Sequence, residues 1–166
     1  MHSFESHIRN VPDFPKAGIL FKDITPLLQE RFDEVIEAMA STIKWEEIDY
    51  VVGIESRGFI LGAAMATLKG KGFIPVRKKG KLPPPVIAET YTLEYGTDTL
   101  EMIVNHKPGR VVLVDDVLAT GGTLKAVMNL CHKNQFEVKA LSLLINLTFL
   151  NKFTQEGHPV HSVLNY

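Results

Sequence analysis

The most constraining feature of the chain is the stretch from Val111 to Leu124, which reads VVLVDDVLATGGTL. Four aliphatic residues in succession are typical of a strand in a parallel sheet, because helices cover both faces of such a sheet. Two adjacent carboxylates follow, then a loop of small residues, then an apolar pattern with helical spacing. The stretch therefore predicts a strand–loop–helix unit whose polar residues lie at the carboxyl end of a buried strand.

The rest of the chain alternates in the same way. Strands are expected over 49–54, 73–76, 110–114 and 138–145, and helices over 31–44, 56–68 and 123–133. The segment 77–102 begins basic and proline-rich and then alternates as a hairpin does. Residues 1–10 suggest a short amphipathic helix, and the prolines that follow prevent residues 11–28 from forming one regular element. This order predicts an α/β fold, a parallel sheet flanked by helices, with a small N-terminal cap and a hairpin.

Length and composition narrow the classes of function. A chain of 166 residues suits a single domain, here taken as residues 1–166. The net charge of −1 gives no general attraction for nucleic acid. No apolar run reaches the roughly 18 residues of a membrane span, so no membrane partner is expected. The single cysteine, Cys131, cannot form an internal disulfide, and we expect a cytoplasmic protein.

Asp115 and Asp116 are the first candidate binding residues. In an open α/β sheet, ligands bind outside the carboxyl ends of the strands. Two charges roughly 5 Å apart repel by about 3 kcal/mol at an effective dielectric constant near 20. A cation or a ligand rich in hydroxyl groups would offset that cost, and the two neighbouring hydroxyls of a ribose suit two acceptors.

The loop from Ala119 to Thr123 is suited to a phosphate. Glycine permits backbone conformations that close around an anion, and the free N–H groups at a helix start favour negative charge. The alternative is purely structural, with one acid capping the helix and the glycines forming a tight turn. The whole ordered string after a buried strand favours the binding site.

These residues resemble the phosphoribosyl-pyrophosphate (PRPP) motif of the type I phosphoribosyltransferases. The resemblance implies that Asp115 and Asp116 contact the ribose hydroxyls. It implies that the loop holds the 5′-phosphate through Ala119, Thr120, Gly121, Gly122 and Thr123.

Three further segments, PDFPKAGILFKDITPLL, GIESRGF and TLEYG, are similar to segments of the adenine phosphoribosyltransferases. The resemblance extends from about Ile8 to Tyr166 and implies that residues 1–30 contribute a hood over the base. In that hood Phe21 would stack on adenine, and the main chain of Leu20 and Lys22 would read its edge. A site that binds a flat purine needs an aromatic ring for stacking and a few well-positioned hydrogen-bond donors and acceptors.

The same resemblance implies a pyrophosphate site built from two segments. Ser56, Arg57 and Gly58 of GIESRGF follow a strand, and in the family this loop often begins with a cis peptide bond that involves no proline. The alternative is that Ser56 caps the next helix while Arg57 pairs on the surface. The basic run RKKGKLP adds Arg77, Lys78 and Lys81 as a clamp for the anion, partly across the interface of a homodimer.

The resemblance places the proton chemistry on Glu94, proposed as acid or base at N7 of adenine, with Tyr95 sealing the site. Both belong to a loop, about 78–104, that closes over the site. Mg²⁺ would be bound mainly by PRPP, with no direct protein ligand. The expected reaction is adenine plus PRPP giving AMP plus pyrophosphate, with transfer to another purine or non-catalytic PRPP sensing as alternatives.

The sequence departs from the family pattern at four positions. Ala17 replaces a frequent proline, Glu55 an aspartate, Pro84 a glycine and Asn146 a glutamate. None of these changes removes a proposed catalytic group, but Glu55 lies beside the pyrophosphate loop.

Overall fold

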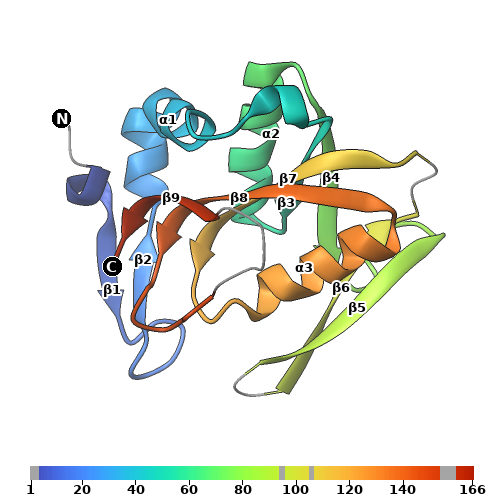
Figure 1. Ribbon diagram of the computed structural model, residues 1–166. Helices are drawn as coiled ribbons and strands as arrows, with labels where there is room; N and C mark the ends of the chain where they lie inside the picture. The colour runs from blue at the N-terminus through green and yellow to red at the C-terminus, as the bar shows by residue number, and fades with distance from the viewer. Residues whose placement is uncertain (1–3, 94–95, 105–106, 154–159) are drawn as a thin grey trace.

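The computed structural model describes residues 4–93, 96–104, 107–153 and 160–166, and in this part of the chain strands and helices alternate (Figure 1). The elements in chain order are η1 Phe4–His7, β1 Arg9–Pro12, β2 Leu20–Asp23, α1 Thr25–Ala40, η2 Trp45–Glu47, β3 Tyr50–Ile54, α2 Arg57–Lys69, β4 Gly72–Lys78, β5 Val86–Leu93, β6 Gly96–Ile103, β7 Gly109–Leu118, α3 Gly122–Lys133, β8 Phe136–Asn146 and β9 Val160–Asn165. Among the described helices, none has the length and apolar composition needed to cross a bilayer.

The centre of the fold is a seven-stranded sheet in the order β5-β6-β4-β3-β7-β8-β9. The strands β4, β3, β7, β8 and β9 run parallel, and β6 joins β4 antiparallel as part of the β5–β6 hairpin. The strands β3 and β7 are neighbours, with Gly53 opposite Val114. Because both strands end at the same edge of the sheet, the loops that follow them lie side by side.

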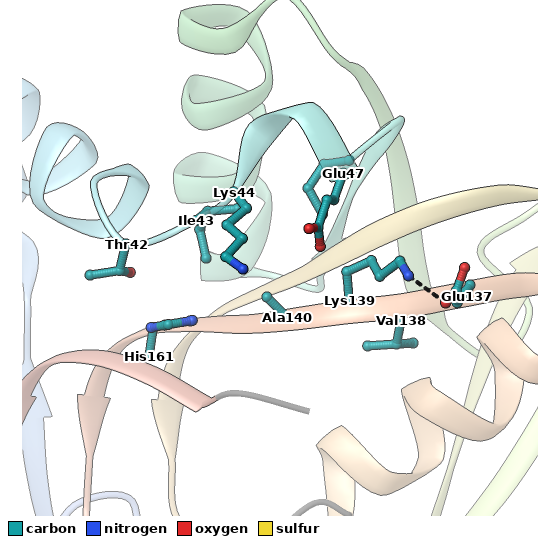
Figure 2. A pocket seen from close by; sticks show the side chains of 10 residues that line it. Thr42, Ile43, Lys44, Glu47, Glu137, Val138, Lys139, Ala140 and His161 are labelled. Atoms are coloured by element: carbon teal, nitrogen blue, oxygen red, sulfur yellow. Dashed lines mark hydrogen bonds and ion pairs between the residues drawn. The ribbon is translucent and has the colours of Figure 1, made fainter. Parts of the chain in front are cut away.

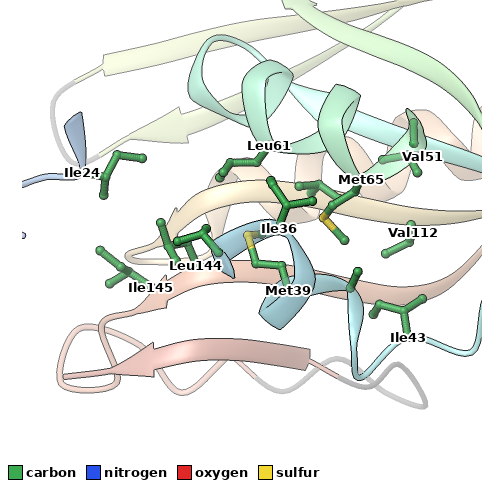
Figure 3. Close-up of a cluster of buried hydrophobic side chains, with 14 of the residues drawn as sticks. Ile24, Ile36, Met39, Ile43, Val51, Leu61, Met65, Val112, Leu144 and Ile145 are labelled. Carbon is green, nitrogen blue, oxygen red and sulfur yellow. The ribbon is translucent and has the colours of Figure 1, made fainter. Parts of the chain in front are cut away.

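Helices cover both faces of the sheet, as the sequence predicts. In Figure 1, α1 and α2 lie on one face and α3 lies on the other. The apolar side chains between the sheet and the first two helices form one buried cluster that includes Met39, Met65 and Val112 (Figure 3). A second buried cluster, which includes Leu113, Leu124 and Leu141, lies between the sheet and α3.

The N-terminal cap is a separate two-stranded sheet, called the hood below and defined as β1 and β2. Val11 pairs with Phe21 in its antiparallel register. Asp23 ends β2 and joins the hood to the body, because its Oδ1 accepts a hydrogen bond of 2.9 Å from the backbone N–H of Thr25, the first residue of α1. Arg9 holds the other carboxylate oxygen of Asp23, with Nη2 at 2.8 Å from Oδ2.

Three elements differ from the sequence-based expectation. The helix α1 begins at Thr25, six residues before the expected start at Arg31, because Pro26 fits the first turn of a helix, where its missing N–H costs no hydrogen bond. Arg31 itself has non-helical backbone angles, with φ of −138° and ψ of 32°, so the expected helix corresponds to the part of α1 that follows this kink. The N-terminal segment contains a 3-10 turn and a strand in place of a helix. The strand β9 was not expected, although its Val163 and Leu164 pack against the first core cluster.

The strand β7 is also longer than predicted, and this bears on the site. It continues to Leu118, so Asp115 and Asp116 lie within it and not after its end. The pairing with β8 reaches Leu118, whereas the pairing with β3 stops at Val114. The two acids are therefore held by regular strand pairing on the β8 side and stand beyond the last pair on the β3 side.

Gly58 allows α2 to begin directly against β7. A Cβ atom on Gly58 would lie 2.7 Å from the carbonyl oxygen of Val114 and 3.1 Å from Oδ1 of Asp115. The first of these atoms belongs to the backbone and cannot move aside easily. Any side chain at this position would push the start of α2 away from the acidic end of β7.

Gly58→Ala should therefore lower the free energy of unfolding by roughly 1–3 kcal/mol, the usual cost of overpacking. Gly122→Ala is the matched control, because its Cβ would meet no atom closer than 3.6 Å and its φ is not positive. Equilibrium unfolding in urea measures both variants. Equal stability of Gly58→Ala and wild type would contradict the close approach.

Candidate active site

Asp115 and Asp116 stand next to each other on β7 as an acidic pair. The backbone N–H of Asp116 donates to Oδ1 of Asp115 at 2.9 Å. Burial, together with the negative charge of Asp116, raises the pKa of Asp115 well above its usual range. The side chain of Asp116 is only 8% exposed. Its Oδ2 is buried and accepts no well-formed hydrogen bond from the described residues. The pair therefore offers one buried acceptor oxygen, Oδ2 of Asp116, that lacks a well-formed hydrogen bond from the described part of the chain.

Arg57 is the cation that faces this pair. Its Nη2 lies 2.9 Å from Oδ2 of Asp116, an ion pair whose angle does not meet that of a hydrogen bond. Its guanidinium also lies over the ring of Phe21, with Cζ 5.0 Å from the ring centroid. Arg57 therefore contacts both the acidic pair and the hood, and these contacts belong neither to the expected pyrophosphate role nor to the alternative of a surface ion pair.

The loop after β7 has the geometry expected of an anion cradle. Gly121 has φ of +89°, a conformation that residues with a side chain rarely adopt, and it stands at the N-cap of α3. No side chain caps that helix start, and its first turn contains no acidic residue. The N–H groups of Gly122 and Thr123 thus point toward a site that the helix dipole makes favourable for a phosphate.

A neighbouring residue that the sequence analysis missed supports this loop. A Cβ on Gly121 would lie 2.3 Å from Cδ2 of Phe153, so the Phe153 ring packs directly on the Gly121 backbone. The N–H of Phe153 donates to Oδ1 of Asn151 at 3.1 Å, which fixes the turn that carries the ring. A lone phenylalanine after a strand carries no sequence signal of such a contact.

The loop after β3 brings Ser56, Arg57 and Gly58 to the same edge. The peptide bond between Glu55 and Ser56 is cis, as the family resemblance implied. Ser56 is the N-cap of α2, but its side chain makes no capping hydrogen bond. Arg57 pairs with Asp116 and not with a surface partner. The missing capping bond of Ser56 and the pairing of Arg57 with Asp116 both argue against the alternative in which Ser56 only caps α2 and Arg57 pairs on the surface.

Glu55 contacts three residues of the basic segment RKKGKLP, which lies next to this loop. Its Oε1 lies 2.7 Å from Nζ of Lys81 and 3.3 Å from Nη2 of Arg77, and its Oε2 accepts a 3.0 Å hydrogen bond from the N–H of Lys78. Burial opposes ionisation, but these hydrogen bonds and the charge of Arg77 outweigh it and lower the pKa of Glu55 to about 2. The Lys78 side chain pairs separately, with Nζ 3.2 Å from Oδ2 of Asp98. All three cations expected to hold pyrophosphate therefore have partners within the chain.

In the hood, the ring of Phe21 contacts a second aromatic ring and the guanidinium that pairs with Asp116. Phe21 packs edge-on against Phe14, with ring centroids 5.1 Å apart and an interplanar angle of 71°. On its other side stands the guanidinium of Arg57. Leu20 is exposed, and Nζ of Lys22 lies 4.0 Å from the centroid of the Tyr166 ring. Three chain segments, the hood, the loop after β3 and the loop after β7, thus meet at one edge of the sheet.

Glu94 and Tyr95 lie outside the described residues. The strand β5 that leads to them runs beside the phosphate loop, because a Cβ on Gly122 would lie 3.6 Å from Cδ2 of Tyr91 and 3.7 Å from the carbonyl oxygen of Thr92. The sequence-based hairpin is confirmed as β5 and β6, which pair from Val86 opposite Ile103 to Leu93 opposite Gly96.

Two further features bear on the extent of the site, namely the distribution of metal-ligating side chains and a cavity away from the acidic pair. Within the described ranges no three His, Cys, Asp or Glu side chains are grouped as a metal site would require. A cavity of about 510 Å³ lies elsewhere, between the segment after α1 and the starts of β8 and β9, where Lys44, Glu47 and His161 line it (Figure 2). Since these strand starts face away from the carboxyl edge, the cavity is separate from the acidic pair.

Glu55→Gln tests the electrostatic role of Glu55 through its pH dependence. The folded-state pKa of about 2 lies below the ordinary value of 4.5, so ionised Glu55 stabilises the fold fully above pH 4.5. The difference in unfolding free energy between wild type and Glu55→Gln should shrink as pH falls from 4.5 toward 2. Urea unfolding at a series of pH values measures it, and a difference that grows on acidification would refute the assignment.

The comparisons with known proteins agree with this geometry. Residues 23–160 match the family model described as the phosphoribosyl transferase domain. The chain is 51% identical to an adenine phosphoribosyltransferase of Bdellovibrio bacteriovorus over 166 residues, which covers 98% of each chain. The structure of the adenine phosphoribosyltransferase of Rhodothermus marinus is similar with a TM-score of 0.89 at 48% identity, covering 98% of this chain and 96% of that one.

The enzyme of Saccharomyces cerevisiae, in complex with an imino-altritol bisphosphate and adenine, is similar with a TM-score of 0.80 at 34% identity, covering 96% of this chain and 95% of that one. A matched domain that spans most of the chain and full-length relatives at this identity show the family. The chain belongs to the phosphoribosyltransferases and, within them, to the adenine phosphoribosyltransferase family.

Proposed function

We propose that this protein transfers the phosphoribosyl group of PRPP to adenine, giving AMP and pyrophosphate in purine salvage. The main support for this proposal is that three features lie together at one edge of the sheet. They are the acidic pair Asp115–Asp116, the uncapped helix start at Gly121 and the aromatic plate of Phe21. Family membership adds the substrates, since the yeast relative binds adenine and a bisphosphate analogue.

The residue roles follow from what each group offers. The acidic pair accepts the two ribose hydroxyls, and the buried Oδ2 of Asp116 gains the hydrogen bond it lacks. The backbone of 119–123 and the hydroxyls of Thr120 and Thr123 hold the 5′-phosphate. Ser56 and the N–H of Gly58 are available for pyrophosphate.

Arg77, Lys78 and Lys81 would complete the pyrophosphate site by exchanging partners. In the structure Arg77 and Lys81 bind the Glu55 carboxylate, and Lys78 binds Asp98. A pyrophosphate anion carries more charge than one carboxylate and competes for these cations. Glu55 therefore keeps the basic run ordered and close to the site until the anion arrives.

The reaction breaks the bond from C1′ to pyrophosphate and forms the bond from C1′ to N9 of adenine, and the adenine ring gives up one proton to a base. Positive charge develops on the ribose as pyrophosphate leaves, as in other glycosyl transfers. The base stacks on Phe21, which requires the Arg57 guanidinium to move from its present place or to cover the second face of the base. Glu94 would accept the proton that the adenine ring releases at N7. Tyr95 would help the loop 78–104 to close over the site.

Mg²⁺ fits this site as an ion held mainly through PRPP. The acidic pair can supply one or two carboxylates to the ion. Mg²⁺ commonly binds through one or two carboxylates together with substrate phosphates. When bound, it would stabilise the charge that develops on the departing pyrophosphate.

We further propose a homodimer in the cytoplasm. Ile60 and Leu68 on α2 are about half exposed, and an apolar groove of about 500 Å³ lies beside them between α1 and α2. These exposed apolar side chains suit an interface between two copies. The buried free thiol of Cys131, whose pKa burial raises to about 12, suits a reducing compartment.

The base specificity is tested by offering adenine, hypoxanthine and xanthine separately with PRPP and Mg²⁺ and measuring the nucleotide formed. We expect AMP to form at least roughly 10⁴-fold more efficiently than the 6-oxo nucleotides, because a site that hydrogen-bonds one base edge rejects the edge with reversed donors. If hypoxanthine or xanthine were converted faster than adenine, that base would be the substrate and the proposed specificity would be wrong. Tight PRPP binding without turnover of any base would indicate a PRPP sensor.

Glu94→Ala tests the proton chemistry. The turnover number should fall roughly 10²-fold or more, the usual contribution of a positioned acid or base, while the affinity for PRPP stays within twofold. Steady-state kinetics and titration calorimetry with PRPP measure the two quantities. Glu137→Ala is the control, because Glu137 pairs with Lys139 on the surface of β8. Equal losses of turnover and affinity would contradict the assigned role.

A further inference from the structure

The hood is attached to the body at its two ends, where Ile8 before β1 and Ile24 after β2 are buried in the first core cluster. The hood strands pair only with each other in the described sheet topology, so no backbone ladder joins them to the seven-stranded sheet. Asp23 connects β2 to α1 through the N–H of Thr25. Nothing in that connection fixes how deep the other end of β2, at Leu20 and Phe21, sits over the acidic pair.

Lys22 and Tyr166 supply a contact on the back of the hood. Nζ of Lys22 lies 4.0 Å from the centroid of the Tyr166 ring, well within the range of a cation–π interaction. Neighbouring side chains on a strand point to opposite faces. Phe21 accordingly faces Arg57 and the acidic pair, whereas Lys22 reaches Tyr166, which follows β9. Figure 1 shows the end of β9 beside β1 and β2.

Tyr166 is itself firmly attached to the body. Its N–H donates to the carbonyl oxygen of Asn146 at 2.9 Å, and its carbonyl oxygen accepts 2.7 Å and 2.6 Å hydrogen bonds from the N–H and hydroxyl of Thr148. Its ring packs against the first core cluster. Burial and the nearby charge of Glu5 raise the pKa of the Tyr166 hydroxyl, so the ring remains neutral. The aromatic face under Lys22 is therefore fixed to the end of β8.

We propose that Tyr166 is a positioning residue for the base, which acts through Lys22 to hold Phe21 at its stacking depth. The proposal rests on the proposed function, in which β2 reads adenine. Tyr166 touches neither substrate, and the acidic pair and the phosphate loop lie on other segments. Loss of the ring should therefore weaken adenine binding selectively and leave PRPP binding unchanged.

Tyr166→Leu removes the aromatic face and keeps the charge of Lys22. We expect a roughly threefold to tenfold rise in KM for adenine, the range that a partly exposed cation–π contact supports, with KM for PRPP within twofold. Tyr166→Phe keeps the ring and should stay within twofold of wild type in both constants. Lys22→Met combined with Tyr166→Leu should be no worse for adenine than the more damaging single variant, because both changes break one contact.

Lys69→Met is the matched control. It removes a lysine whose Nζ lies 5.9 Å from the Trp45 ring centroid, the same kind of contact away from the hood. Its kinetic constants should equal those of wild type. A Tyr166→Leu variant with unchanged KM for adenine, or with equal changes in both KM values, would overturn the proposal, as would a Tyr166→Phe variant as impaired as Tyr166→Leu.

Amide hydrogen exchange separates this proposal from the proposed function, because it requires no substrate. Tyr166→Leu should speed exchange in β1 and β2 at least threefold while β7 and α3 stay as in wild type. That result supports the anchor even if wild type fails to use adenine, a failure that would count against the proposed function alone. Unchanged exchange in the hood, or equal acceleration throughout the chain, would show that Tyr166 does not anchor the hood.

Discussion

The site depends on two carboxylates held side by side in a nearly buried strand. Asp115 and Asp116 belong to β7, where pairing with β8 fixes their backbone and the end of β3 leaves their other side open. At a separation of roughly 5 Å, two such charges would cost about 3 kcal/mol at an effective dielectric constant near 20. The protein reduces this cost by raising the pKa of Asp115 and by placing Arg57 against Asp116. It does not remove the cost, because Oδ2 of Asp116 keeps no hydrogen bond from the described residues.

The neighbouring parts of the structure follow from that arrangement. Arg57 can reach Asp116 because α2 starts directly against β7, and only a glycine at position 58 permits that approach. The same guanidinium lies over Phe21 and so connects the acidic pair to the hood. Glu55, immediately before this loop, keeps Arg77 and Lys81 nearby. A ligand with a ribose, a phosphate and a flat base would therefore meet matching groups on three separate segments.

The sequence predicts most of the sheet because its strands and helices carry clear periodic patterns. It also predicts Asp115, Asp116 and the loop 119–123 as candidate binding residues, since an acidic pair and paired glycines after an aliphatic strand are local signals. The position of Arg57 between Asp116 and Phe21 is a contact between segments distant in the chain, and no local pattern encodes it. The packing of Phe153 on Gly121 and of Tyr166 beneath Lys22 has the same origin. The periodic pattern from Arg31 matches the part of α1 that follows its kink, whereas the preceding turn contains Pro26, which is compatible with both a loop and a first helical turn.

The central claim is that the acidic pair grips a ribose while the hood reads the base, and a crystal structure with AMP bound tests it most directly. We expect the ribose hydroxyls within hydrogen-bond distance of Asp115 and Asp116 and the 5′-phosphate on the N–H groups of 119–123. We also expect the adenine ring to stack on Phe21. A ribose bound away from β7, or a base that makes no contact with β2, would contradict it.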